Sequence, residues 1–307
     1  MPRRIRIGLF RVMGMEECVS QAIRVLPERV QTLVAAQCAR KAVRIEELRL
    51  RTGCPVSLFA GGREWGLSDA DGPCVADGAM LRQVVARATE HSLYAAGEQL
   101  RNGYCTLPGG HRLGICGSAV MDDGQIRTLT AFSSLNLRVA RQLRGCADAL
   151  FRALWQRPLS MLLIGPPGCG KTTMLRDLIR QLSDRSRFRV GVVDERGELA
   201  ACLDGVPQFS VGACTDVLTS SSKEAGIYLL LRSMRPDWIA LDEISALEDV
   251  EALCRASYAG VRFLATAHAQ GRADLDKRPV YRALLETGVF SLLAVLSPDR
   301  QLTIEGL

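Results

Sequence analysis

Aromatic residues, histidines and long apolar runs are all scarce in this 307-residue sequence. Phe, Trp and Tyr make up 5% of the chain, and there are three histidines. The eleven cysteines are scattered, and no two of them are spaced as Cys-x-x-Cys. Together these absences argue against a zinc or disulfide framework, so we expect reduced and mostly buried thiols.

No segment has the roughly 18 to 20 consecutive apolar residues that a membrane-spanning helix requires. The longest apolar stretch, residues 289–296, has the length of a strand. Basic residues at the N-terminus resemble the start of a signal peptide, but the apolar residues 7–10 are followed at once by Arg11, so no apolar core forms. The sequence therefore predicts a cytoplasmic chain without internal repeats or low-complexity segments.

The formal net charge of +6 is carried largely by arginine clusters at 3–6, 49–51 and 138–144. Such clusters could face phosphates, anionic lipid or another subunit, although an excess this small also fits a solvated surface. Docking of residues 2–11 onto an anionic membrane is a hypothesis. The basic stretches lack interleaved aromatic residues, which disfavours nucleic acid as a partner.

The most informative motif follows the apolar residues 161–164 and has the form Gly-x4-Gly-Lys-Thr. Between a strand and a helix this pattern is typical of a phosphate-binding loop, because backbone N–H groups and the positive helix end surround a phosphate. A chance glycine-rich turn would not explain the flanking strand and helix. Lys171 is predicted to reach the β- and γ-phosphates of ATP, and the Thr172 hydroxyl to bind Mg²⁺. The predicted nucleotide-binding residues are Gly165, Pro166, Pro167, Gly168, Cys169, Gly170, Lys171, Thr172 and Thr173.

Cys169 differs from the other cysteines because it lies in this loop, near Lys171 and a helix N-terminus. That setting favours the thiolate, so we expect bound nucleotide to slow its alkylation.

An acidic strand end completes the predicted site. The apolar run 238–241 reads as a buried parallel strand neighbouring the loop, and it ends in Asp242 and Glu243. Asp242 is predicted to hold Mg²⁺ directly or through water, and Glu243 to act as the base that polarises water. The alternative is a strand followed by a solvated acidic turn.

The N-terminal part, residues 1–145, is predicted to form a small α+β domain. It combines two helical patterns with short strands and a glycine-punctuated β segment. The expected helices are 15–44 and 80–100, and the expected β segments are 46–51, 55–59, 103–117 and 135–144.

The C-terminal part, residues 146–307, is predicted to form an α/β domain. After a helix at 147–155, apolar strands alternate with helices, as in a parallel sheet with crossover helices. The expected central strands are 161–165, 189–194, 238–242 and 261–267, followed by an appended hairpin of 291–295 and 301–304.

Three segments of this domain resemble the arginine, acidic and histidine boxes of type II and type IV secretion ATPases, which are RecA-like hexameric motors. They are 231–237, containing Arg232 and Arg235, then Asp242-Glu243, and 265–269, containing His268. The resemblance is closer still to the stage III sporulation protein AA family of endospore-forming bacteria. The matching segments are 47–55, 107–117, 133–138, 193–200 and 248–252.

The resemblance implies a RecA-like P-loop ATPase domain with a smaller α+β N-terminal domain, assembled as a homohexamer. It further implies an ATP-hydrolysing secretion-type motor in the mother cell, energising a channel to the forespore. Membrane channel proteins of the sporulation stage III complex would be its partners, and through them it would associate peripherally with the membrane facing the forespore.

The resemblance also implies roles for individual carboxylates and a histidine. Glu243 corresponds to the catalytic glutamate, and Asp242 stands where many secretion ATPases have glycine. Asp194-Glu195 takes the place of the acidic box, on a strand expected to adjoin the phosphate loop, so Glu195 competes with Glu243 for the base role. Asp194-Glu195 could instead cap a following helix. His268 would sense the γ-phosphate, although a lone histidine at a strand end can also be structural.

Four arginines are further catalytic candidates. Arg232 and Arg235 could serve the same phosphate or pair with acidic residues at 242 and 237. Arg138 and Arg141 resemble arginines that secretion motors bring to nucleotide at an interface, where an arginine acting in trans can raise the rate. For each of them, a surface salt bridge is the alternative.

Two alternative functions would also use the phosphate-binding loop. The first is a nucleic-acid-associated RecA-like ATPase, which predicts steeply salt-dependent binding to single strands. The second is an assembly scaffold that binds ATP tightly without releasing phosphate.

Overall fold

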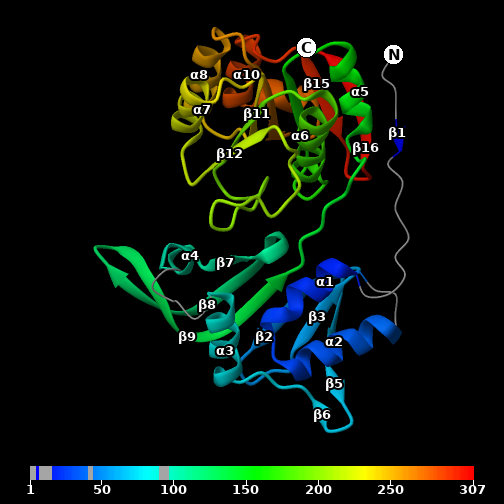
Figure 1. Cartoon of the computed structure of the whole chain (residues 1–307), viewed down its shortest axis with the longest axis vertical. Coiled ribbons are helices and arrows are strands. Elements are labelled where there is room, and N and C mark those ends of the chain that lie inside the picture. The colour runs from blue at the N-terminus through cyan, green and yellow to red at the C-terminus, as the bar shows by residue number, and fades with distance from the viewer. Residues whose placement is uncertain (1–4, 7–15, 41–43, 90–96) are drawn as a thin grey trace. The chain divides into compact units, whose positions relative to one another are not determined.

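The computed structural model describes residues 5–6, 16–40, 44–89 and 97–307 (Figure 1). The chain divides into two compact units. The smaller is Phe10–Arg141, and the larger combines Met1–Leu9 with Gln142–Leu307. Our predicted boundary after residue 145 falls just beyond this division. Most of the basic segment 2–11 lies outside the described residues.

The smaller unit is built on a six-stranded antiparallel sheet in the order β4-β3-β2-β9-β8-β7. Apolar residues of β2 alternate with exposed ones, and Ile45, Leu48 and Leu50 are fully buried in its core. A two-stranded ribbon, β5 (Ser68–Asp69) and β6 (Gly72–Pro73), forms a separate pair. The sheet strands are β2 (Ile45–Arg51), β3 (Ser57–Ala60), β4 (Arg63–Gly66), β7 (Tyr104–Leu107), β8 (His111–Asp122) and β9 (Gln125–Arg138).

Proline divides the first predicted helix. Instead of one helix over 15–44, the chain forms α1 (Glu17–Ala22), a 3₁₀ turn η1 (Ile23–Val25) and α2 (Glu28–Arg40). Leu26, before Pro27, is extended at φ −79° and ψ 157°, because a residue preceding proline is pushed out of the helical region.

The second predicted helix begins with α3 (Gly78–Ala88), which is capped by Asp77. The short α4 (Gly97–Arg101) follows after residues 90–96, which lie outside the described part of the chain. A 3₁₀ turn, η2 (Pro108–Gly110), joins β7 to β8. The predicted strand 135–144 is found only as far as Arg138, where β9 ends; β9 starts ten residues earlier than predicted, at Gln125, and pairs with β8 as a long hairpin.

The larger unit contains an eight-stranded sheet in the order β1-β16-β15-β10-β14-β13-β11-β12. Six strands, from β15 to β12 in this order, are parallel, and β16 and β1 (Ile5–Arg6) are added antiparallel beyond β15. The strands are β10 (Met161–Gly165), β11 (Val190–Asp194), β12 (Thr215–Thr219), β13 (Trp238–Glu243), β14 (Arg262–His268), β15 (Leu292–Leu296) and β16 (Gln301–Gly306).

Helices cover both faces of this sheet (Figure 1). On one face, Leu163 of β10 belongs to the core that contains α5 and α6. On the other, Leu162 and Ile164 pack in the core with α7, α8 and α10. All of β10 is buried, as expected of a strand inside a parallel sheet. The helices are α5 (Asp148–Gln156), α6 (Lys171–Ser186), α7 (Lys223–Ser233), α8 (Leu247–Ser257), α9 (Arg272–Lys277) and α10 (Pro279–Glu286).

Strand order corrects two predictions. The C-terminal hairpin is not appended, because β15 pairs in parallel with β10 along residues 161–164. Neither acidic strand adjoins β10, since β14 lies between β10 and β13, and β11 lies beyond β13. The edge strand β12 was not predicted. None of the helices in the described part of the chain is long and apolar enough to cross a membrane.

Candidate nucleotide-binding site

The predicted motifs meet at the carboxyl edge of the parallel sheet. The phosphate loop follows β10, Asp242 and Glu243 end β13, and His268 ends β14 between them. Gly165 is in register with His268, which brings the loop beside the histidine. Ligands of open α/β sheets bind at this edge.

The phosphate loop has space where a ligand must approach. Gly168 and Gly170 adopt φ of +75° and +109°, and a Cβ on either would meet no atom within 4 Å. At Gly165, by contrast, a Cβ would lie 2.4 Å from the Leu296 carbonyl oxygen. Helix α6 starts at Lys171 without a side-chain cap. Its first N–H groups lack intrahelical partners, so the loop fits a phosphate.

Lys171 is engaged with the protein itself. Its Nζ donates to the carbonyl oxygens of Gly165 and Pro166 at 2.9 and 3.0 Å, and lies 2.9 Å from His268 Nδ1. Burial lowers the pKa of Lys171, and the charges of Cys169, Glu243 and Asp242 oppose this. An ammonium group only donates, so Nδ1 accepts and, in the neutral ring, the hydrogen is on Nε2.

Asp242 lies close to two threonine hydroxyls. Its Oδ1 is 3.4 Å from Thr172 Oγ1 and 3.2 Å from Thr266 Oγ1. Burial raises the pKa of Asp242 to about 6, and the charge of Glu198 acts in the same direction. Carboxylate and hydroxyl oxygens are hard ligands of the kind Mg²⁺ prefers, so Thr172 and Asp242 fit the predicted metal role.

The backbone at Asp242 has a feature that the sequence did not reveal. Between Leu241 and Glu243 the pairing of β13 with β14 shifts register, so that Asp242 is an additional residue in the ladder. Such a β-bulge re-aims the side chains around it and is common beside active sites. It interrupts the strict alternation that would send the two neighbouring carboxylates to opposite faces.

The two candidate bases belong to different networks. Glu243 Oε2 is 3.3 Å from His268 Nε2 and 3.3 Å from Arg196 Nη1. Glu195 Oε2 is instead 2.7 Å from Nζ of Lys223, the first residue of α7. Only Glu243 is therefore connected, through His268, to the lysine of the phosphate loop.

Asp194 has a structural position. It is 1% exposed, and its carboxylate accepts the backbone N–H groups of residues 198, 199 and 200 at 2.8 to 2.9 Å. No helix begins in the described residues between β11 and β12, so the helix cap considered for Asp194-Glu195 is not formed, and the amides bound by Asp194 belong to a turn.

Arg176 of α6 holds the same turn from the other side, and sequence reasoning missed it. Its guanidinium donates to the Leu199 and Glu198 carbonyls at 2.7 and 2.6 Å, and it lies over the Phe209 ring. Burial lowers the pKa of Arg176 to about 10. An arginine on a helix has no spacing that would reveal this role in advance.

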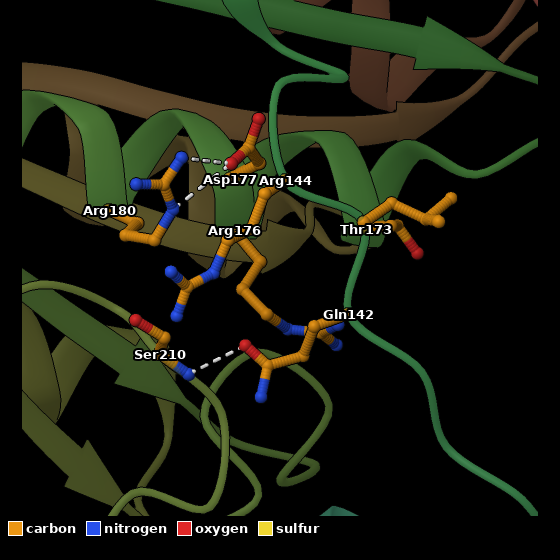
Figure 2. Close-up of a pocket in the computed structure, with 8 residues that line it drawn as sticks. Gln142, Arg144, Thr173, Arg176, Asp177, Arg180 and Ser210 are labelled. Atoms are coloured by element: carbon orange, nitrogen blue, oxygen red, sulfur yellow. Dashed lines mark hydrogen bonds and ion pairs between the residues drawn. The ribbon is translucent and has the colours of Figure 1, made fainter. Parts of the chain in front are cut away.

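A depression in the surface lies beside α6, next to Thr173, Arg176 and Arg180 (Figure 2). Gln142 closes one side, and its Oε1 accepts the Ser210 N–H at 2.9 Å. Asp177 accepts from Arg180 at 2.6 Å and from the Ala147 N–H, just before α5, at 3.0 Å. These contacts fix the segment before α5 against the nucleotide-binding helix. The lining residues are Gln142, Leu143, Arg144, Thr173, Arg176, Asp177, Arg180 and Ser210.

Arg232 and Arg235 lie away from the phosphate loop of their own subunit. Both precede β13 and are exposed, at the amino edge of a parallel sheet whose strands rise about 3.3 Å per residue. The predicted pairing with acidic residues is not made: Asp237 pairs with Arg189 at 2.9 Å, and Asp242 contacts the two threonines.

Arg138 and Arg141 have different environments in the smaller unit. Arg141 is 12% exposed, pairs with Glu16 at 2.6 Å and donates to the Ile45 carbonyl. Its role there is structural, which matches the salt-bridge alternative except that the pair is mostly buried. Arg138 is 62% exposed and 3.7 Å from Glu47, so it is the accessible arginine of the two.

All eleven cysteines are free thiols, as predicted, and most are at least partly buried. Cys169, singled out for its place in the phosphate loop, is buried at 5% exposure. Cys54 and Cys116 are the exposed thiols.

The fold and the site define a RecA-like P-loop ATPase domain joined to a smaller α+β domain. The pilus retraction motor PilT, solved with bound ADP, has a TM-score of 0.61 at 18% identity, over 91% of this chain and 82% of PilT. For the Legionella pneumophila ATPase DotB the TM-score is 0.57 at 16% identity, over 91% of this chain and 80% of DotB. At these identities the likeness concerns the fold alone.

Residues 16–306 match the family model described as sporulation stage III, protein AA, and the chain belongs to that family. Stage III sporulation protein AA of Bacillus subtilis (strain 168) is 38% identical over 284 residues, which cover 91% of each chain. The resemblance inferred from the motifs is thereby confirmed.

Proposed function

We propose that this protein is an ATP-hydrolysing motor of the secretion type. The observation that carries the proposal is the connected set at the carboxyl edge of the sheet. Lys171 contacts His268, and His268 contacts Glu243. Thr172 contacts Asp242, the residue before Glu243. These are the groups that ATP hydrolysis needs: a phosphate loop, a metal-binding pair and a base.

Each side chain has a distinct task in this proposal. The phosphate-loop amides and Lys171 bind the phosphates of ATP, for which the lysine exchanges its contacts with the loop carbonyls. Thr172 and Asp242 would hold Mg²⁺, which when bound neutralises phosphate charge. Glu243 takes a proton from the attacking water as the bond to the γ-phosphate breaks, giving ADP and phosphate.

The contacts of the two glutamates support Glu243 as the base. A base must have its carboxylate near the water that attacks the γ-phosphate, and Glu243 is linked through His268 to Lys171. Glu195 is occupied by Lys223, which also lies 3.4 Å from Asp249 in the first turn of α8. His268, between lysine and base, is suited to sense the γ-phosphate.

We further propose that subunits assemble as a homohexamer and that exposed Arg138 reaches nucleotide at an interface. Arg232 and Arg235, which are far from their own phosphate loop, would then act only toward a neighbouring subunit. An arginine supplied in trans makes activity depend on assembly. ATPase activity should therefore rise faster than linearly with protein concentration, and strict proportionality would contradict the arrangement.

The cellular role is proposed from the family. The Bacillus subtilis relative is a sporulation stage III protein. A motor of this fold in the mother cell would energise a channel to the forespore, held at the membrane by channel proteins through its smaller unit. Co-purification with such membrane proteins, lost on deletion of the smaller unit, would support this role.

The test of the motor is phosphate release by the purified protein with Mg-ATP, recorded together with oligomeric mass. Lys171→Ala should reduce turnover about 100-fold or more, because it removes the cation at the phosphates. The exposed Lys277, replaced in the same way, is the matched control. Nucleotide-dependent assembly without turnover in the wild type would favour the scaffold, and steeply salt-dependent binding to single strands would favour the nucleic-acid alternative.

A further inference from the structure

Arg196 lies beside the proposed base, although no role was predicted for it within the matching segment 193–200. Its Nη1 is 3.3 Å from Glu243 Oε2, and its side chain is 60% exposed. The residue follows Glu195 in the turn after β11. It therefore places an exposed cation at the carboxylate that, in the proposed function, acts on water.

The backbone that carries Arg196 is held firmly. Asp194 accepts the N–H groups of residues 198–200, and its carbonyl accepts the Gly197 N–H at 3.3 Å. Arg176 holds the carbonyls of residues 198 and 199. Because Arg176 belongs to α6, the turn is fixed to the phosphate-binding helix. Any movement of Arg196 is therefore a movement of its side chain.

The Arg196–Glu243 pair is exposed enough to be exchanged easily, since such pairs are weak in water. Both donors to Glu243, Arg196 and His268, use the same oxygen, Oε2. A γ-phosphate offers more negative charge and several oxygens, and guanidinium binds phosphate in a bidentate manner. It would compete with the carboxylate for the arginine.

We propose that Arg196 recognises the γ-phosphate of ATP, leaving Glu243 when ATP binds and thereby freeing the base to accept a proton. This inference rests on the proposed function and assigns a substrate-binding residue to the same site. ADP has no γ-phosphate, so it leaves the Arg196–Glu243 pair in place. The residue thus distinguishes ATP from ADP and couples that distinction to the base.

The test is the affinity of the full-length protein for the non-hydrolysable β,γ-imido analogue of ATP and for ADP, both with Mg²⁺, measured by calorimetry. Arg196→Ala should weaken binding of the analogue about tenfold or more and leave ADP binding within about twofold, as expected for loss of one charged contact. Arg255→Ala is the control, because Arg255 is similarly exposed (56%) and has its own partner, Glu251, at 3.0 Å.

A double-mutant cycle tests the transfer itself. Glu243→Gln removes the competing carboxylate, so it should tighten analogue binding more when Arg196 is present than in the Arg196→Ala background. Equal gains in both backgrounds, or equal loss of analogue and ADP binding in Arg196→Ala, would overturn the inference. Failure of the wild type to bind either nucleotide would instead overturn the proposed function. Matching thermal unfolding curves show that each variant is folded.

Discussion

Replacement of Glu243 by glutamine should abolish multiple turnover while leaving ATP bound. The substitution is isosteric, and we expect the contacts of residue 243 with His268 and Arg196 to change little. His268 and Arg196 both approach Oε2 of the carboxylate. A glutamine with its oxygen at that position can accept from both, so the principal loss is the ability to take a proton.

The size of the effect follows from this separation of roles. A positioned general base contributes about 10²- to 10⁴-fold to the rate, which corresponds to about 3 to 5 kcal/mol in the activation barrier. We expect Glu243→Gln to lower the rate constant for phosphate release by a factor within that range. Affinity for ATP should stay equal or increase, because one negative charge near the phosphates is removed.

Single-turnover phosphate release, with enzyme in excess of ATP, is the suitable assay because it separates chemistry from product release. Glu195→Gln is the matched control, identical in chemistry at the competing position. Glu195 is 2.7 Å from Lys223, which retains Asp249 at 3.4 Å when the glutamate is neutralised. We expect that variant to lose less than about tenfold in rate.

The opposite ranking would refute the reasoning. The base would be Glu195 if Glu195→Gln lowered the rate of phosphate release about 100-fold or more, as expected for loss of a general base, while the rate of Glu243→Gln remained close to that of the wild type. The contacts of Glu243 with His268 and Arg196 would then describe a resting ion-pair network with no part in proton transfer.

Three further predictions concern other parts of the chain. Asp194→Asn should lower the free energy of unfolding in urea by about 2 to 4 kcal/mol, since an amide cannot satisfy all three N–H groups. The control Asp77→Asn, at a helix N-cap, should change that free energy by less than about 0.5 kcal/mol. Equal losses in the two variants would contradict the structural assignment of Asp194. Burial lowers the pKa of His111 to about 4, so stability is fully present above pH 6.5 and is lost as pH falls toward 4. The loss should reach about 2.5 kcal/mol at pH 4.5 in urea titrations, and His111→Gln should remove that slope. By peptide mass mapping, Cys169 should be alkylated more slowly than exposed Cys54 and more slowly again with Mg-ATP; equal rates with and without ATP would contradict this.

The elements of the fold could be predicted where the chain shows strong local patterns. The buried strand before the phosphate loop and the acidic strand both appear within a residue of their predicted ends. Strand β12 was missed because 215–219 is neither alternating nor strongly apolar. The central place of β15 could not be predicted, since the order of strands in a parallel sheet depends on contacts between segments far apart in sequence.

The candidate site, like the fold, could be predicted only where local sequence patterns determine it. Spacing alone predicted the phosphate loop, and the resemblance added the role of His268. The environments that distinguish similar residues arise only on folding. Glu16 is 125 positions from Arg141 yet pairs with it, and Lys223 contacts Glu195 from the start of α7. Arg196 acquires its position from a turn held by Asp194 and by Arg176 of α6, which no local pattern encodes.

The pairing of β1 with β16 has a mechanical consequence. Because β1 belongs to the sheet of the larger unit, the smaller unit is an insertion, and the chain passes between the units twice, after Leu9 and after Arg141. Two tethers restrict relative motion more than a single linker does, since each closes a loop and removes conformational freedom. A single proteolytic nick near Arg141 would leave every nucleotide-binding residue intact while releasing one of the two tethers. Such a nicked protein would separate nucleotide binding from the continuous connection of the larger unit to the smaller one.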